Sequence, residues 1–312
     1  MANVRFAVPD DTVIVADGGL ATELEARGFD LSGDLSDPLW SARLLLDAPD
    51  DIAAVHAAFF AAGAMIATTA GYQASFEGFA ARGIDRRAAE RLLRRSVDLA
   101  RLAGGGARGH WVAASVGPYG AARADGSEYV GRYGLSVSEL TAWHRPRLEV
   151  LADAGADVLA LETIPDVDEA EALLRLVSEA DVPAWLSYTI EGTSTRAGQP
   201  LTDAFAVAAG VPQIAAVGVN CCVPDDVLPA IEIAREITGK PVIVYPNSGE
   251  SWRSGRWAGP ARFSPALVPL WVAAGARIIG GCCRVGPADI AAAAAALRRT
   301  CTQRENPAGD SQ

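Results

Sequence analysis

Four of the five cysteines in this 312-residue chain occur as two adjacent pairs, and each pair follows a short apolar run. Cys221 and Cys222 follow residues 217–219, whereas Cys282 and Cys283 follow residues 276–281, which end in two glycines. If both runs are strands of one parallel sheet, their carboxyl ends lie on one rim and bring the thiols together. Three sulfur ligands with a fourth position free are typical of a catalytic zinc site. The pattern therefore predicts zinc at this rim.

Other uses of these cysteines are less consistent with the pattern. Neighbours in sequence rarely form a disulfide, and the count is odd, so metal ligands or reactive thiols are favoured. Small buried thiols that only fill space remain the alternative. Because successive side chains of a strand point to opposite faces, Cys282 and Cys283 can bind one ion only if the chain bends at residues 280–281, where glycine permits it. Cys301 stands alone and is expected to be a free thiol.

The elements that must position these thiols alternate regularly along the chain. Apolar runs predict eight strands, at residues 13–16, 65–70, 111–116, 158–163, 184–188, 215–221, 242–245 and 277–281. Helical patterns occupy residues 20–28, 48–63, 85–103, 136–155, 168–180, 201–210, 224–239, 264–275 and 287–299. Ala-Gly-Ala at residues 62–64, 154–156 and 274–276 predicts a helix end just before a strand.

This order predicts the α/β class and a (β/α)8 TIM barrel, with an open doubly wound sheet as the alternative. We expect one domain over residues 1–300 and a disordered tail over residues 301–312. The formal net charge of −11 argues against nucleic acid as a partner, because binding it needs a basic face. No apolar run is long enough to span a membrane and no signal peptide is recognisable, so we expect a cytoplasmic protein. The oligomeric state is left open.

In a barrel of this kind the chemistry lies where the strands end. The residues at the predicted strand ends are polar and rich in thiols: Asp17, Gly18, Thr68, Thr69, Ser115, Gly117, Tyr119, Glu162, Thr163, Tyr188, Thr189, Asn220, Cys221, Tyr245, Asn247, Cys282 and Cys283. All three histidines fall elsewhere. His56 and His144 lie in helical patterns, and His110 precedes its strand, so a histidine-based nucleophile is not expected. Residues 248–257 form a long loop after the seventh strand, which is either a lid or a plain surface loop.

Several motifs resemble those of the homocysteine S-methyltransferases, which use S-methylmethionine or S-adenosylmethionine. Betaine-homocysteine methyltransferase and the homocysteine domain of cobalamin-dependent methionine synthase are more distant relatives. The resemblance runs from residue 13 to residue 297. It rests on Asp-Gly-Gly-Leu-Ala-Thr-Glu-Leu at 17–24, Asp-Pro-Leu-Trp-Ser at 37–41, Ala-Thr-Thr-Ala-Gly-Tyr-Gln-Ala-Ser at 67–75, Gly-Pro-Tyr-Gly at 117–120, Asp-Gly-Ser-Glu-Tyr at 125–129, Glu-Thr-Ile-Pro at 162–165, Gly-Val-Asn-Cys at 218–221, Tyr-Pro-Asn-Ser-Gly-Glu at 245–250 and Gly-Gly-Cys-Cys at 280–283.

This resemblance implies that zinc is bound by Cys221, Cys282 and Cys283, with Cys222 outside the ligand set. It also implies that Asp17, Gly18 and Glu162 hold the amino acid end of homocysteine. We add Thr69 and Asn220 as further substrate-binding candidates. Gly71 departs from the family, where a hydroxyl residue is expected.

The implied reaction is zinc-dependent methyl transfer from a small sulfonium donor to the thiol of homocysteine, which yields methionine. Zinc would hold the homocysteine thiol as a thiolate, and a sulfonium leaves as a neutral thioether without a general acid.

Two alternatives stay open. A betaine donor on the same fold calls for an aromatic cage, for which Tyr119, Tyr188, Trp252 and Trp257 are available. A non-catalytic zinc-binding or thiol-sensing protein would instead use Cys221, Cys222, Cys282 and Cys283 as a closed four-sulfur site.

Overall fold

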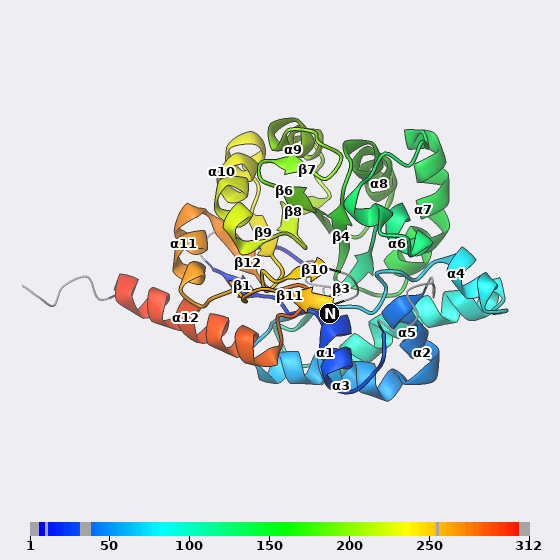
Figure 1. The fold of residues 1–312 in the computed structure, drawn as a ribbon, viewed down its shortest axis with the longest axis horizontal. Helices are drawn as coiled ribbons and strands as arrows, with labels where there is room; N and C mark the ends of the chain where they lie inside the picture. Colours follow the sequence, from blue (N-terminus) through cyan, green and yellow to red (C-terminus); the bar gives the residue numbers. More distant parts are fainter. Residues whose placement is uncertain (1–5, 10–11, 32–38, 254–255, 306–312) are drawn as a thin grey trace, which may run out of the picture.

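The computed structural model describes residues 6–9, 12–31, 39–253 and 256–305, and it is built around one parallel sheet of eight strands. In spatial order the strands are β1 (Ile14–Val15), β12 (Ala276–Ile279), β9 (Val242–Tyr245), β8 (Ile214–Asn220), β5 (Ala184–Tyr188), β4 (Val158–Ile164), β3 (Trp111–Val116) and β2 (Ile66–Thr68). A bridge between Ala16 and Ile66 joins the two ends of this order, so the sheet closes into the barrel seen in Figure 1. The predicted TIM barrel is confirmed, and the open-sheet alternative is wrong.

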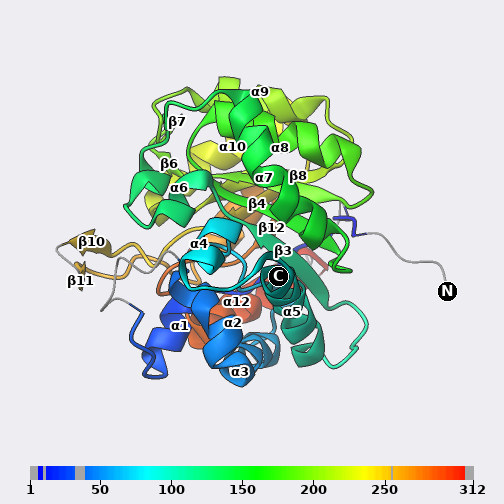
Figure 2. The same cartoon turned by 90° about the vertical axis from the view of Figure 1, so that its right-hand side faces the viewer.

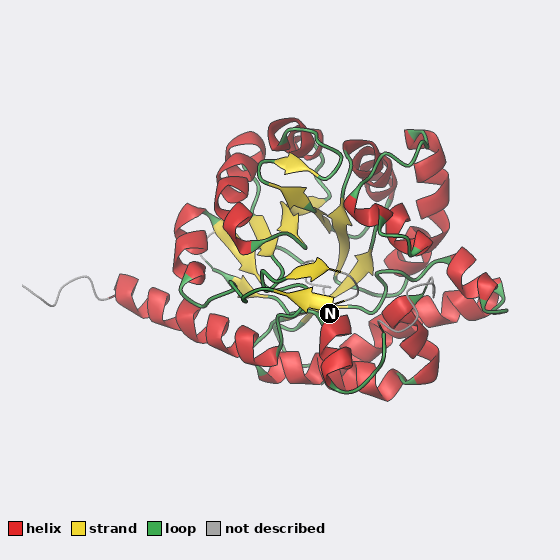
Figure 3. Cartoon of the chain, in the orientation of Figure 1, coloured by secondary structure: helices red, strands yellow, loops and turns green. Residues whose placement is uncertain are grey.

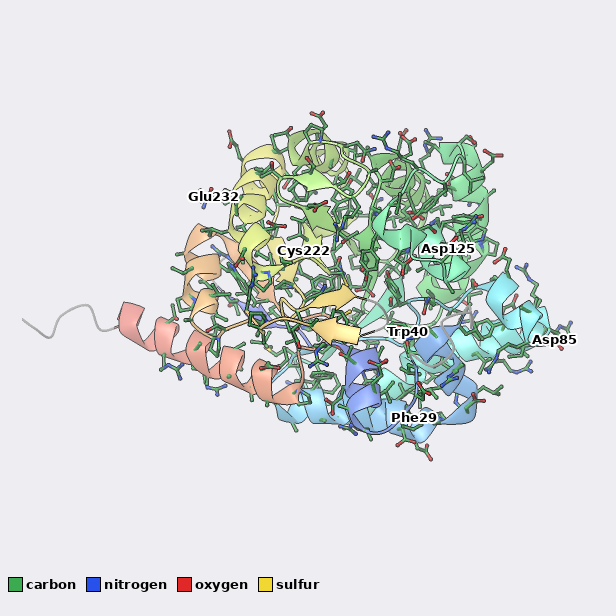
Figure 4. All side chains as sticks on the ribbon, viewed as in Figure 1. Phe29, Trp40, Asp85, Asp125, Cys222 and Glu232 are labelled. Atoms are coloured by element: carbon green, nitrogen blue, oxygen red, sulfur yellow. The ribbon has the colours of Figure 1, made fainter. Side chains whose placement is uncertain are left out.

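The main helices lie outside the ring of strands, as Figure 3 shows. They are α1 (Leu20–Ala26), α3 (Pro49–Ala61), α5 (Arg86–Ala103), α7 (Val137–Ala152), α8 (Val167–Glu179), α9 (Leu201–Ala209), α10 (Val227–Thr238), α11 (Leu267–Ala274) and α12 (Pro287–Glu305). Short helices occupy the connections: η1 (Trp40–Arg43), α2 (Leu44–Asp47), α4 (Phe76–Ala81), α6 (Tyr119–Arg123), η2 (Ser127–Tyr129) and η3 (Pro224–Asp226). Exposed carboxylates such as Asp85 and Glu232 project from this outer layer (Figure 4).

Local sequence explains where these helices begin and end. The Ser136 hydroxyl and the Glu139 side chain form a capping box at the start of α7. The glycines of the three Ala-Gly-Ala sequences, Gly63, Gly155 and Gly275, all have positive φ and lie just before β2, β4 and β12, as predicted.

The last helix differs from its prediction. Helix α12 continues to Glu305, beyond the predicted end at residue 299 and across the expected domain boundary at residue 300. Residues 306–312 of the expected tail lie outside the described residues. None of the described helices is long and apolar enough to cross a membrane.

Two hydrophobic layers hold the barrel together. One lies between strands and helices, and the other fills the barrel interior. At the amino end of the interior, Phe6 is buried and packs edge-on against Trp111, with 5.5 Å between ring centroids. Above it the Trp185 indole donates a hydrogen bond to the Tyr245 hydroxyl over 3.0 Å. The interior is thus packed solid up to Tyr245, which leaves chemistry to the opposite, carboxyl end of the strands.

Several connections gather at that end. Figure 2 shows α6, the hairpin of β6 (Ile190–Glu191) and β7 (Ser194–Thr195), and the hairpin of β10 (Ser251–Arg253) and β11 (Arg256–Ala258) on the same side of the molecule. The β10–β11 hairpin overlaps the predicted loop 248–257, extends one residue beyond it to Ala258, and crosses the barrel mouth in Figure 1. Its position over the rim agrees with the prediction, and its role as a lid stays a prediction.

Close approach of two strands gives a first prediction. A methyl group at Gly218 would lie 1.7 Å from the carbonyl oxygen of Ile243 on the neighbouring strand. We expect Gly218→Ala to force β8 and β9 apart and to lower the free energy of unfolding by about 3 kcal/mol or more. Gly210→Ala is the matched control, because nothing lies within 4 Å of the added methyl and φ is negative there. Urea unfolding of both variants tests this; equal stability would contradict it.

A buried histidine gives a second prediction. His56 on α3 is fully buried, and neither ring nitrogen has a hydrogen-bond partner among the described residues. Burial lowers the pKa of His56 from 6.5 to about 4. The unfolded chain therefore binds a proton that the folded chain does not, so the His56 contribution to stability is complete above pH 6.5 and falls as the pH drops towards 4.

At pH 5 this difference amounts to about 2 kcal/mol relative to pH 8. His56→Leu keeps the bulk of the side chain and removes the titrating group. We expect the variant to lose about 2 kcal/mol less stability than the wild type between pH 8 and pH 5, measured by urea unfolding. An identical pH dependence in both proteins would contradict the prediction.

Candidate functional site

Three of the five cysteines meet at the carboxyl rim of the barrel. The Sγ atoms of Cys221, Cys282 and Cys283, which we call the cysteine triad, all lie within 4.8 Å of one another. Cys221 directly follows β8 and has a positive φ of 49°. The other two follow β12, after residues 280–281 have left the strand, so the bend predicted at the two glycines is present.

The two glycines are required by close packing at this bend. A methyl group at Gly281 would lie 2.1 Å from Val285, and one at Gly280 would lie 2.7 Å from the carbonyl oxygen of Asp17. The Gly281 amide in turn donates to that same oxygen over 2.9 Å. The end of β12 is therefore held against the end of β1, which fixes where Cys282 and Cys283 stand.

Cys222 does not join this group. It is buried in the hydrophobic layer between sheet and helices, and burial raises the pKa of its thiol well above the usual value. Figure 4 labels it among the side chains packed around the barrel. The closed four-sulfur site considered from the sequence is thus not formed, whereas the expectation that Cys222 stays apart from the other three agrees with the structure.

The cysteine triad concentrates negative charge. Hydrogen bonds from the thiols of Cys221 and Cys282 lower the pKa of Cys283 well below its usual range. The pKa of Cys282 is raised in return by its hydrogen bonds to the other two sulfurs. The other two thiols therefore favour a thiolate at Cys283. A soft divalent cation that replaces those protons fits such a donor set, because thiolates are the ligands that zinc prefers.

Two carboxylates lie at the same rim. Asp17 follows β1, and its two oxygens accept hydrogen bonds from the Thr68 amide over 2.7 Å and the Thr68 hydroxyl over 2.9 Å. Burial nevertheless raises the pKa of Asp17 to about 8, with a smaller contribution from the charge of Glu162.

Glu162 on β4 is buried in the same way. Ser115 and Tyr245 direct their hydroxyls at its carboxylate. Burial raises the pKa of Glu162 to about 7 against the hydrogen bond from Ser115, and the charge of Cys221 adds to the rise. Among the described residues, no lysine, arginine or histidine forms an ion pair with Asp17 or Glu162, so both carboxylates favour a positively charged ligand.

The other predicted substrate residues form the walls of the site. A methyl group at Gly18 would lie 2.1 Å from the carbonyl oxygen of Val285, so no side chain fits there. The Thr69 hydroxyl accepts a hydrogen bond from the Ser115 amide over 3.1 Å. Asn220 pairs with Thr163 through two hydrogen bonds, of 2.8 Å to its amide and 2.7 Å to its hydroxyl. These contacts stabilise Thr163 in its left-handed conformation, with φ of 58°. Contact of Gly18, Thr69 and Asn220 with a substrate stays a prediction.

A buried network of charged side chains lies behind the rim, and the sequence did not predict it. Arg147 on α7 is 2% exposed and donates to the carbonyl oxygens of Ala74 and Gly117, which follow β2 and β3. His144 lies 2.8 Å from Glu169 of α8. Arg147 also contacts the His144 ring over 3.0 Å, and the spacing of these two residues by one helical turn is the sequence signal for the network. The network fixes the loops that follow β2 and β3.

Two of the four aromatic residues considered for a cage pack against helices. Tyr188 faces the helices, where its hydroxyl donates to Ala204 over 2.7 Å and its ring packs on Phe205. Tyr119 packs against Trp143 of α7, at 5.0 Å between centroids. Tyr188 faces outward because its position at the end of β5 points to the helix layer, so the cage prediction is wrong for this ring. Tyr119 is the first residue of helix α6 and not part of a strand. The side chain of Trp252 lies outside the described residues.

Two other tyrosines and one glutamate interact with the triad. Tyr72, Glu128 and Tyr129 interact electrostatically with Cys221. Sequence reasoning assigned them no role, although all three belong to motifs quoted for the family resemblance. Their loops follow β2 and β3, which was the signal that could have placed them at the rim.

Comparison with known proteins agrees with this geometry. Residues 14–297 match the family model described as homocysteine S-methyltransferase. The chain is 45% identical over 303 residues to the homocysteine S-methyltransferase of Escherichia coli, covering 93% of this chain and 96% of that protein. It is 44% identical over 305 residues to the homocysteine S-methyltransferase YbgG of Bacillus subtilis, covering 92% and 95%.

A solved structure resembles the fold as well. The crystal structure of the homocysteine methyltransferase MmuM from Escherichia coli in its metallated form superimposes with a TM-score of 0.81 at 44% identity, covering 92% of this chain and 96% of the other. A family match over most of the chain, a shared barrel and a cysteine triad at its rim lead to one assignment: the chain belongs to the homocysteine S-methyltransferase family.

Proposed function

We propose that this enzyme transfers a methyl group from a sulfonium donor to the thiol of homocysteine, with zinc bound by Cys221, Cys282 and Cys283. One observation carries the proposal: the Sγ atoms of the cysteine triad lie within 4.8 Å of one another, at the rim that also holds the buried carboxylates of Asp17 and Glu162. The names of the relatives in Escherichia coli and Bacillus subtilis support homocysteine as the acceptor. The metallated form of MmuM supports a metal at the corresponding rim.

Zinc suits this donor set and supplies one chemical function. When bound, it lowers the pKa of a substrate thiol so that the thiol is a thiolate at neutral pH. The protein residues do the rest. Asp17 and Glu162 bind the ammonium group of homocysteine, which supplies the cation that their burial requires. The backbone at Gly18 lets the amino acid end approach closely.

The methyl transfer itself needs positioning more than acid-base chemistry. After the homocysteine thiol has lost its proton, its sulfur forms a new bond to the donor methyl as the old bond from that methyl to the donor sulfur breaks. The electron pair of the broken bond stays on the donor sulfur, which leaves as a neutral thioether. No general acid is required, which is consistent with three histidines that lie away from the triad. We place the enzyme in the cytoplasm, where thiols stay reduced.

The ligand assignment yields a third prediction. Cys221→Ala, Cys282→Ala and Cys283→Ala should each lose zinc and methyl transfer, because two sulfurs do not hold the ion at neutral pH. Cys222→Ala is the control, since this neighbour lies in the hydrophobic layer. It should keep zinc and activity. Metal analysis of the dialysed proteins with a methyl-transfer assay tests this, and a full complement of zinc in the Cys282→Ala protein would refute the ligand assignment.

The role of Glu162 yields a fourth prediction. Glu162→Gln removes the charge but keeps the shape, so it should weaken homocysteine binding by about 2 to 5 kcal/mol, the usual loss for one side of a buried charge pair. Zinc should be retained. The variant should also lose its preference for homocysteine over a simple alkanethiol that lacks the amino group, measured as a ratio of kcat/KM values. Equal losses with both thiols would show that Glu162 supports the site in general and does not bind the ammonium group.

A further inference from the structure

The turn η2 carries Glu128, whose carboxylate interacts electrostatically with Cys221 of the cysteine triad. Asp125 accepts a hydrogen bond from the Ser127 amide over 3.0 Å, and the Gly131 amide donates to the Ser127 carbonyl over 3.0 Å. Beneath the turn, a methyl group at Gly120 would lie 2.4 Å from the Glu128 amide nitrogen. The turn is thus fixed by hydrogen bonds and by tight packing on α6, so the position of Glu128 is built into the fold.

The carboxylate of Glu128 is left unsatisfied in this position. Its Oε2 atom is shielded from solvent and has no hydrogen-bond partner among the described residues. Burial raises the pKa of Glu128 to about 7, and the charges of Asp125 and Cys221 raise it further against a backbone hydrogen bond. A shielded carboxylate without a partner is costly unless a ligand compensates it.

Two tyrosines complete the same region. The Tyr72 hydroxyl is also buried without a partner of good hydrogen-bond geometry, and its polar neighbours include Thr163, Glu128 and Cys221. Tyr129 is 37% exposed as a residue, and the guanidinium of Arg196 lies over its ring at 5.8 Å from the centroid. Burial and then the charges of Cys221 and Cys283 raise the pKa of Tyr129 well above the usual value.

We propose that Glu128, with the side chains of Tyr72 and Tyr129, forms the subsite that binds the positively charged methyl donor against the cysteine triad. This inference rests on the proposed function and specifies its second substrate as a sulfonium amino acid. A sulfonium carries a full positive charge before transfer and none afterwards. A carboxylate and electron-rich rings therefore bind the donor more tightly than the thioether that remains.

The same residues are not needed for homocysteine. Asp17 follows β1, and Glu162 lies on β4. These two residues already offer two carboxylates to one ammonium group. Glu128 lies in the loop after β3 and Tyr72 in the loop after β2, and both interact electrostatically with Cys221. The acceptor and the donor are thus bound by separate sets of side chains that share only the sulfur atoms between them.

The test compares charged and neutral ligands by calorimetry on the zinc-loaded enzyme. Two pairs are used: S-methylmethionine with methionine, and S-adenosylmethionine with S-adenosylhomocysteine. The wild type should bind the charged member of at least one pair at least tenfold more tightly than its neutral product, and the pair that shows this identifies the donor. Glu128→Gln should reduce that preference at least tenfold. In turnover, the donor KM should rise while the KM for homocysteine and the zinc content stay unchanged.

Glu149→Gln, an exposed glutamate on α7, is the matched control and should behave as the wild type. Glu128→Asp, which keeps the charge, should recover part of the preference even if the glutamine variant folds poorly. An undiminished preference for the charged ligand in Glu128→Gln, or none in the wild type, would overturn the inference. Retained charge preference without methyl transfer from either donor would instead refute the proposed function and leave the cation subsite standing.

Discussion

The contact between the ends of β1 and β12 determines where the chemistry of this protein can occur. The Gly281 amide donates to the Asp17 carbonyl, and the Gly19 amide donates to the Val285 carbonyl. These hydrogen bonds join the first carboxylate of the rim to the turn that carries the last two thiols. Without them Cys282 and Cys283 would have no fixed relation to Cys221 on β8, and neither glycine tolerates a side chain at this crowded point.

The barrel also brings several acidic groups, thiols and carboxyls, together in a buried place. Two neighbouring thiols lower the pKa of Cys283, whereas the pKa values of Asp17, Glu162 and Glu128 are all raised, first of all by burial. Such a site is poorly satisfied as it stands and is stabilised by cations. Local instability of this kind is common at functional sites, where the ligand supplies the missing charge. The solid interior from Phe6 to Tyr245 and the Arg147 network support the rim from below and behind.

Much of the fold and part of the site could be predicted from the sequence. Periodicity located all eight barrel strands, because buried parallel strands are short apolar runs, and the Ala-Gly-Ala stops predicted three helix ends. Two cysteine-bearing strand ends predicted the triad, since parallel strands share a rim. The extension of α12 to Glu305 was missed because its polar last turn gives no apolar pattern. The outward turn of Tyr188 was missed for another reason: alternation along a strand does not say which face is the core when both faces are buried.

The functional candidates that the sequence did not predict were missed for one physical reason. Tyr72, Glu128 and Tyr129 lie in loops, whose conformation depends on turns and packing far apart in the chain, such as Gly120 beneath η2. That same dependence separates the loops from the framework. The triad and the two rim carboxylates are fixed by barrel closure, whereas the side chains proposed to contact the donor are fixed by local turns after β2 and β3. A change in those turns alters which cation fits without moving the sulfur atoms or the residues proposed to hold homocysteine. A barrel of this design can therefore keep one acceptor site while the loops proposed to bind the donor vary.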